Sequence, residues 1–201
     1  MSLSTKKSNE AIKYLQAAEG EILTYLKRIV RNKDFNYRTF GTAIEEHLTD
    51  VIVKILSEGG FIKNNSDYLV SPNKNYFPDF ELKTKPPLAI EFKSGNRSQY
   101  RGGKWVKVKN SENDMGTLNE WPKKIEKFGG DHIYYIFVIY NFDNTTKEVL
   151  NVKVAPFYQF IGLSKGKVFK YREKDGNLRP KNFDIAPQIK TFKQFMELLK
   201  Q

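Results

Sequence analysis

Three charged side chains stand where their neighbours indicate buried strands. The stretch at 76–95 reads YFPDFELKTKPPLAIEFKSG, with Asp79 directly after a proline and with Glu91 and Lys93 two residues apart inside an apolar run. Burying a charge without a partner is unfavourable. The three side chains are therefore expected to meet around something that compensates their charges.

Strand geometry gives these residues a shared chemistry. Successive side chains of a strand point to opposite faces, so Glu91 and Lys93 share a face while Ile90 and Phe92 point toward the core. An antiparallel pairing across the short Pro-rich turn would bring Asp79 beside Glu91. Two neighbouring carboxylates repel, and Mg²⁺ relieves this in a site of carboxylate, carbonyl and water oxygens. Lys93 would then stabilise charge on a scissile phosphate or help position the nucleophile.

A plainer structure is also compatible with this pattern. In a surface hairpin, Asp79 would be a turn residue, and Glu91 and Lys93 would belong to a cross-strand charge pair. Glu81 shares a face with Asp79 and is either a spare ligand or a solvated strand residue. We favour the cation site, because the charges interrupt a run that otherwise has the composition of a core strand.

Composition restricts the class of protein. The length of 201 residues suits one compact domain, and 39% hydrophobic residues suffice for a core. There is no cysteine, which excludes disulfides and thiolate metal sites and suits the cytoplasm. No signal-like segment or membrane-spanning run is expected. A net charge of +11 favours a polyanionic partner, of which nucleic acid is the commonest.

The elements that position these residues follow from periodicity. Apolar residues at helical spacing predict helices over 8–33 and 42–58, and EGG ends the second. Short strands are expected at 61–64, 67–71, 80–84 and 88–94, followed by a polar, glycine-rich loop and a strand at 105–109. A helix over 114–128 contains Pro122, which marks a late start or a kink.

The second half adds strands and one helix. The almost wholly apolar run at 132–142 predicts a strand buried on both faces, and 148–157 is its hairpin partner. A smaller hairpin is expected over 167–180 around Asp175 and Gly176. Thr191 caps a last helix that ends at Leu199. The order predicts an α/β (α+β mixed) fold, with a mixed sheet flanked by helices.

Asp79, Glu91 and Lys93 together resemble the motif of the PD-(D/E)xK nuclease superfamily. Within it, the chain looks most like type II restriction endonucleases of the EcoRV-like kind, although Glu91 stands where their motif has aspartate. The likeness is carried by EEHLTDVIVKILSEGGFI, by NYFPDFEL with LAIEFKS, and by the helix before HIYYIFVIY. It covers residues 42–141 of a single nuclease domain, 1–201. Residues 142–201 carry no match and are expected to hold DNA-recognition or dimer elements.

The resemblance implies a restriction-endonuclease-like fold with a central sheet of about five or six strands. It also implies Mg²⁺-dependent hydrolysis of double-stranded DNA at a short specific sequence, with Mn²⁺ as a substitute. The enzyme would be a homodimer with one active site per strand, in a restriction-modification system. Asp79 and Glu91 would hold the metal.

A further acid on the preceding helix is implied by the same resemblance. Glu45 lies near the apolar stripe of Leu48 and Ile52, whereas Glu46 points away, so Glu45 is the better candidate for a catalytic and metal-binding role. The alternative is a capping box that begins at Thr42, in which Glu45 only bonds back to the start of the helix. The sequence leaves the two open.

Two polar, basic segments are candidates for DNA contact, because Arg and Lys bind phosphates while Arg, Asn and Gln also read base edges. Each is otherwise a flexible loop or solvated turn. The first segment, after Lys93, holds Asn96, Arg97, Ser98, Gln99, Tyr100, Arg101 and Lys104, and the second holds Asn177, Arg179, Lys181 and Asn182. His47 and His132 lack the spacing of a metal pair and are given no role.

Other functions remain as alternatives. A nuclease of the same fold could act in repair, junction resolution or defence against phage. A non-catalytic protein would bind DNA in a salt-sensitive way without a metal effect. An enzyme of metabolite chemistry is disfavoured, because no glycine-rich phosphate-binding motif follows a strand.

Overall fold

The computed structural model describes residues 3–32, 34–36, 39–72, 76–109, 115–168 and 176–200. Its helices are α1 (Leu3–Ala17), α2 (Glu19–Asn32), α3 (Phe40–Glu58), α4 (Trp121–Phe128) and α5 (Phe192–Leu199). Short 3-10 helices are η1 (Asn65–Asp67), η2 (Leu118–Glu120), η3 (Gly130–His132) and η4 (Phe157–Phe160). The strands are β1 (Tyr68–Val70), β2 (Phe80–Leu82), β3 (Leu88–Asn96), β4 (Ser98–Arg101), β5 (Lys104–Lys107), β6 (Ile133–Phe142), β7 (Lys147–Pro156), β8 (Leu163–Ser164) and β9 (Lys167–Val168).

A five-stranded mixed sheet in the order β1-β2-β3-β6-β7 forms the centre of the molecule. The β3–β6 pair is parallel, and the other three neighbouring pairs are antiparallel. Because β3 and β6 run the same way, the chain must cross over between them, and α4 lies in that connection. The predicted α/β class and mixed sheet are confirmed.

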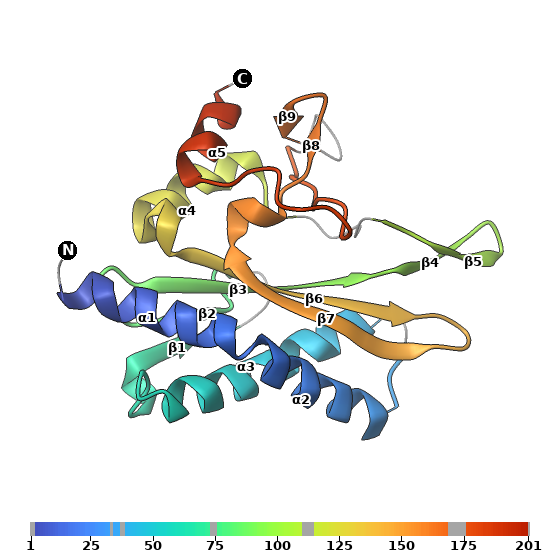
Figure 1. The fold of residues 1–201 in the computed structure, drawn as a ribbon, viewed down its shortest axis with the longest axis horizontal. Coiled ribbons are helices and arrows are strands. Elements are labelled where there is room, and N and C mark those ends of the chain that lie inside the picture. The colour runs from blue at the N-terminus through green and yellow to red at the C-terminus, as the bar shows by residue number, and fades with distance from the viewer. Residues whose placement is uncertain are drawn as a thin grey trace.

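Two layers of helices cover the two faces of the sheet (Figure 1). Helices α1 to α3 pack on one face with the side chains of Ile90, Phe92 and Ile136. The other face carries a second core around Trp121 and Phe157, to which α4, η4 and α5 contribute. Strands β3 and β6 are therefore buried from both sides.

The N-terminal helix differs from its prediction at one place. A single helix was expected over 8–33, but Ala18 separates α1 from α2. The hydrogen-bonded path is nearly continuous, since the Ala18 amide donates to the Tyr14 carbonyl and the Ile22 amide donates to the Ala18 carbonyl. The break places Glu19 beside the edge strand β7, where its carboxylate accepts a hydrogen bond from the Val154 amide (2.8 Å).

Two strand predictions in the first half are corrected. Residues 61–64 are not a strand, because the amides of Phe61 and Ile62 bond to the Leu56 carbonyl and close the end of α3. The expected loop after β3 is a two-stranded hairpin, β4–β5, which projects beyond the sheet (Figure 1).

In the C-terminal half, some of the predicted elements are confirmed and others are not. Helix α4 starts late, with Pro122 in its first turn. Strand β9 pairs with β8, and residues 169–175 of the hairpin expected over 167–180 lie outside the described residues. The Thr191 cap is confirmed, since its hydroxyl accepts a hydrogen bond from the Gln194 amide. No helix in the described ranges is long and apolar enough to cross a membrane.

Candidate active site

The pairing of β2 with β3 brings Asp79 to Glu91. The antiparallel register places Phe80 opposite Ile90, so Asp79 precedes the ladder at the level of Glu91. The Phe92 amide donates a hydrogen bond to Asp79 Oδ2 at 2.6 Å. Strand β2 begins only at Phe80, whereas its partner β3 extends past this level to Asn96, so the β3 amide that would pair with another strand is taken by a carboxylate.

Glu91 and Lys93 lie on one face of β3, as the alternation predicts. Lys93 Nζ donates to Glu91 Oε1 at 2.9 Å, and the two side chains are 12% (Glu91) and 23% (Lys93) exposed. The plain surface-hairpin alternative is therefore wrong about exposure, because these charges are largely covered. The pair satisfies Lys93 but only one oxygen of Glu91.

Helix α3 adds Glu45 to the group. Glu45 is half-buried and is hydrogen-bonded to Ser94 of β3, whereas Glu46 is exposed. The capping-box alternative fails, because α3 begins at Phe40 with Thr39 at the N-cap position, which puts Thr42 inside the helix. We call Glu45, Asp79, Glu91 and Lys93 the carboxylate corner.

Close approach of α3 to the sheet depends on a glycine. A Cβ atom at Gly41 would lie 2.6 Å from Ser94 Oγ and 3.1 Å from the Tyr140 hydroxyl. Gly41 is one helical turn before Glu45, so its small size lets this part of α3 reach β3. No local sequence pattern indicated that Gly41, Ser94 and Tyr140 help to build the site. Alternation along β3 nevertheless places Ser94 on the same side as Phe92.

The charges at the carboxylate corner perturb one another. Burial, followed by the negative charge of Glu91, raises the pKa of Asp79 to about 7, against the opposing hydrogen bond from Phe92. Burial also raises the pKa of Glu45, opposed by the hydrogen bond from Ser94 and by the charge of Lys93. Burial lowers the pKa of Lys93, but attraction to Glu91, Asp79 and Glu45 outweighs it and raises that pKa overall. The site therefore holds more negative charge than one lysine compensates.

The donor set fits a hard divalent cation. Glu91 Oε2 is buried and accepts no hydrogen bond within the described part of the chain. Among those same residues, no three His, Cys, Asp or Glu side chains are grouped closely enough to hold a metal by themselves. Two carboxylates with backbone carbonyl and water oxygens are sufficient for Mg²⁺, which keeps several waters when it binds protein. The unsatisfied oxygen of Glu91 and the raised pKa of Asp79 are conditions under which a bound cation would be favourable.

An open pocket of about 580 Å³ reaches Glu45 and Asp79 of the carboxylate corner, whereas Glu91 and Lys93 do not line it. It is lined by Thr42, Glu45, Glu46, Thr49, Asp50, Val70, Ser71, Pro72, Asp79 and Phe92. Four of these residues are acidic, so a phosphate that enters would be repelled unless a cation neutralised part of the charge.

Glu81 is neither a ligand of this group nor fully solvated. Its side chain is 15% exposed, and Glu81 Oε2 pairs with Lys127 Nζ of α4 at 3.3 Å. In the ladder Glu81 lies opposite Ala89, one pair away from the Phe80–Ile90 pair and farther from Glu91. The ion pair to α4 accounts for its position.

Several candidates for DNA contact in the first segment instead hold the β4–β5 hairpin. Asn96 Oδ1 accepts hydrogen bonds from the amides of Phe142 and Ser98, each at 3.0 Å. Ser98 Oγ donates to Asn141 Oδ1 at 2.5 Å. Arg97 forms an ion pair with Asp184 and lies over the Phe183 ring at 5.3 Å.

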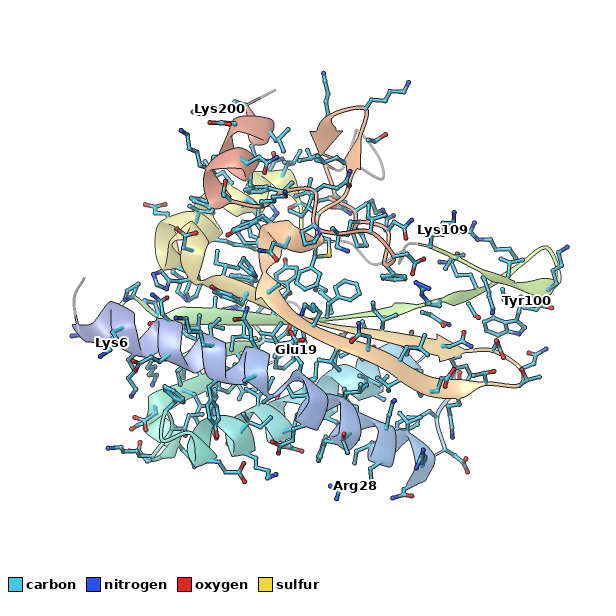
Figure 2. All side chains as sticks on the ribbon, in the orientation of Figure 1. Lys6, Glu19, Arg28, Tyr100, Lys109 and Lys200 are labelled. Atoms are coloured by element: carbon cyan, nitrogen blue, oxygen red, sulfur yellow. The ribbon has the colours of Figure 1, made fainter. Side chains whose placement is uncertain are left out.

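The remaining candidates of that segment lie farther out on the hairpin. Tyr100 is 57% exposed, Arg101 and Lys104 are exposed, and Gln99 is half-buried. Figure 2 shows Tyr100 on this projecting hairpin and Lys109 at its base. Only this outer part offers side chains to a ligand.

Several side chains of the second segment, at 177–182, are buried or hydrogen-bonded within the protein. Arg179 is 7% exposed, which contradicts the expectation of an exposed basic turn. Lys181 Nζ donates to the carbonyls of Asn182 (3.2 Å) and Ile185 (2.6 Å), and burial lowers its pKa. Asn177 forms an isolated bridge with Thr117, and its side-chain oxygen is buried.

Comparison with known proteins finds similarity at the level of solved structures. No family model matches this chain, and no curated protein matches it. Among solved structures, the chain is similar to the NlaIV restriction endonuclease, with a TM-score of 0.52 over 83% of this chain and 15% sequence identity. The chain spans 65% of the length of that neighbour. At this identity the likeness concerns the fold alone, and the protein has a restriction-endonuclease-like fold.

Proposed function

We propose that this protein is a type II restriction endonuclease that hydrolyses double-stranded DNA at a short specific sequence in a Mg²⁺-dependent reaction. The carboxylate corner is then a PD-(D/E)xK active site of the EcoRV-like kind. The observation that carries the proposal is the hydrogen-bonded position of Asp79 against β3, beside the Glu91–Lys93 pair. A fold shared with a restriction endonuclease supports it.

In this proposal the carboxylates bind the metal ion and the lysine acts on the phosphate. Asp79 and Glu91 would hold Mg²⁺, with the carboxylate of Glu45 nearby, and the chemistry of the ion is to polarise the phosphate and to lower the pKa of a bound water. Lys93 is held by Glu91 at 2.9 Å and stays protonated, because the surrounding carboxylates raise its pKa. Its ammonium group stabilises the negative charge that develops on the phosphate during hydrolysis. Ser94 orients Glu45 by hydrogen bonding.

The partner and the assembly follow from the substrate. A net charge of +11 suits a polyanion, even though the pocket itself is lined by acids. Each chain holds one carboxylate corner, and a duplex has two strands, so cutting both strands calls for a homodimer. The chain acts as a single nuclease domain over 1–201, with its catalytic core at 42–141.

The test is to incubate the protein with phage and plasmid DNA in Mg²⁺ or in EDTA. We expect discrete fragments in Mg²⁺ and intact DNA in EDTA. Cutting restricted to branched substrates, or a smear, would instead favour a nuclease with another role. Intact DNA with salt-sensitive binding would favour a non-catalytic DNA-binding protein and would contradict the proposal.

A further inference from the structure

The β4–β5 hairpin continues the strand that carries Glu91 and Lys93. Strand β3 ends at Asn96 and β4 begins at Ser98. The Arg97 carbonyl accepts a hydrogen bond from the Val108 amide, which pairs these two residues just before Ser98 pairs with Lys107. The hairpin is therefore an extension of β3 rather than a separate loop.

The two faces of this hairpin have different neighbours. Paired residues of an antiparallel ladder share a face, so Ser98, Tyr100 and Trp105 lie together. This face meets the β6–β7 turn, where Ser98 bonds to Asn141 and Trp105 Nε1 donates to Asn144 Oδ1. The Tyr100 and Trp105 rings meet edge to face at 5.6 Å.

The opposite face carries Gln99, Arg101, Lys104 and Val106, by the same pairing. Gln99 Oε1 is covered and accepts no hydrogen bond from the described residues, which leaves a polar group without its usual partner. Arg101 and Lys104 face each other across the turn and are exposed. This face therefore offers two exposed cations, Arg101 and Lys104.

The turn at the tip of the β4–β5 hairpin is tight, and there is open space around its two glycines. Gly102 and Gly103 have φ values of 57° and 79°, which is the backbone of a tight two-residue hairpin turn that only glycine adopts readily. A Cβ atom at either position would meet nothing within 4 Å. Two strands of a hairpin lie about 4.8 Å apart, and the major groove of DNA, about 12 Å wide, admits such a ribbon.

Charge on this segment has one sign. Residues 92–111 contain six Lys and Arg and no Asp or Glu. Of the outer residues, Arg101, Lys104 and Lys107 are all exposed. An unbroken basic run on a projecting ribbon is the electrostatic footprint of a nucleic-acid contact, whereas the pocket at the carboxylate corner is acidic.

We infer that the β4–β5 hairpin enters the major groove of the DNA substrate, with Arg101 directed to base edges and Lys104 to a phosphate. Arg is the side chain that binds the guanine edge in a bidentate way. Arg101 lies eight residues after Lys93, at most about 26 Å away at roughly 3.3 Å per residue. The bases read by this arm thus lie within about eight base pairs of the cut, at 3.4 Å per base pair. This inference rests on the proposed function.

The test uses a matched pair of double variants, each of which removes two positive charges from a hairpin. One is Arg101→Ala with Lys104→Ala on β4–β5, and the other is Lys165→Ala with Lys167→Ala on the exposed β8–β9 hairpin. Binding to a mixed-sequence DNA duplex is measured in EDTA over a series of salt concentrations. We expect the slope of log K against log salt to become shallower by about 1 to 2 for the first variant only. Equal slopes for both variants would overturn the inference.

A second measurement tests whether the hairpin reads bases. Ends of genomic DNA cut in Mg²⁺ are sequenced for the wild type and for Arg101→Ala. We expect the variant to accept additional bases at one position of the cut site, whereas unchanged cut sites would show that the arm reads no bases. If the wild type cuts no DNA, the proposed function fails, and the salt slopes still decide whether the arm contacts DNA.

Discussion

The carboxylate corner and the β4–β5 hairpin lie along one strand path but treat charge in opposite ways. At the carboxylate corner, Glu91 and Lys93 are 12% and 23% exposed, and Glu91 Oε2 accepts no hydrogen bond from the residues that the structure describes. On the hairpin, Arg101 and Lys104 carry charge of one sign and are exposed. Covered charges that repel are unfavourable to folding, whereas exposed charges are nearly neutral.

Because of this difference, substitutions in the two regions should affect stability and function in different ways. Substitutions of the acids at the carboxylate corner should slow cleavage and yet relieve repulsion, so activity and stability should move in opposite directions. Substitutions on the hairpin should change DNA binding and leave stability unchanged.

Lys93→Ala should have the largest effect. The variant loses the ammonium group that stabilises charge on the phosphate, and the loss of one such group slows catalysis by about 10²- to 10³-fold. Single-turnover cleavage of plasmid DNA in Mg²⁺ measures it. Lys83→Ala is the control, because Lys83 is an exposed residue just after β2. Cleavage by Lys93→Ala at the rate of the Lys83→Ala variant would remove Lys93 from the mechanism.

Asp79→Asn should also slow cleavage but stabilise the fold at pH 8 in the absence of metal. The pKa of Asp79 is raised from 3.8 to about 7 on folding, so the folded state binds more protons, and stability falls as pH rises through this window. One pKa unit corresponds to about 1.4 kcal/mol, and screening at this half-buried side chain reduces the total. We expect a gain of about 2 kcal/mol at pH 8.

Urea unfolding of the wild type and Asp79→Asn in EDTA measures this gain. The difference should vanish near pH 3, where Asp79 is protonated in both the folded and unfolded states. Asparagine can still accept the hydrogen bond from the Phe92 amide, so that contact does not confound the comparison. A loss of stability at pH 8 would show that the corner is not under electrostatic strain.

Gly41→Ala should reduce both stability and cleavage. Its Cβ would lie 2.6 Å from the buried Ser94 Oγ, which forces α3 or Ser94 to move. Overpacking of this kind destabilises by about 1 to 3 kcal/mol. Gly20→Ala in α2 is the matched control, since nothing lies within 4 Å there and alanine is the better helix former. Equal melting temperatures for the two variants would contradict the close approach of α3 to β3.

Trp105→Phe should have the smallest effect and should confine it to the hairpin. Phenylalanine keeps a ring beside Tyr100 but loses the hydrogen bond to Asn144, for a net change of about 1 kcal/mol. Amide hydrogen exchange should accelerate in β4 and β5 while the melting temperature stays the same. Exchange that is unchanged in both strands would show that the β6–β7 turn does not brace the hairpin.

The sequence was sufficient where periodicity decides the structure. Alternation along 88–94 correctly placed Glu91 and Lys93 on one face, and the Pro-rich turn correctly brought Asp79 alongside. The apolar stripe of the second helix turned Glu45 rather than Glu46 toward the sheet. Each of these results depends on a period of two or of 3.6 residues, which a single sequence displays.

The sequence was insufficient where side chains bond to distant backbone. Asn96 and Ser98 looked like ligands for DNA, but they join the hairpin to the β6–β7 turn. The residues around Arg179 have the composition of an exposed turn, but Arg179 itself is buried. Such contacts bring together residues more than 40 positions apart, and no local pattern indicates them.

The most direct test of the account is thermal unfolding at pH 8 with and without Mn²⁺ or Mg²⁺, for the wild type and Glu91→Gln. At a metal concentration about 100 times the dissociation constant, binding stabilises the fold by about 2.7 kcal/mol. This corresponds to roughly 5 to 10 °C in the melting temperature of the wild type, and Glu91→Gln should show little or none of it. No shift in the wild type, or an equal shift in both proteins, would contradict a cation site at the carboxylate corner.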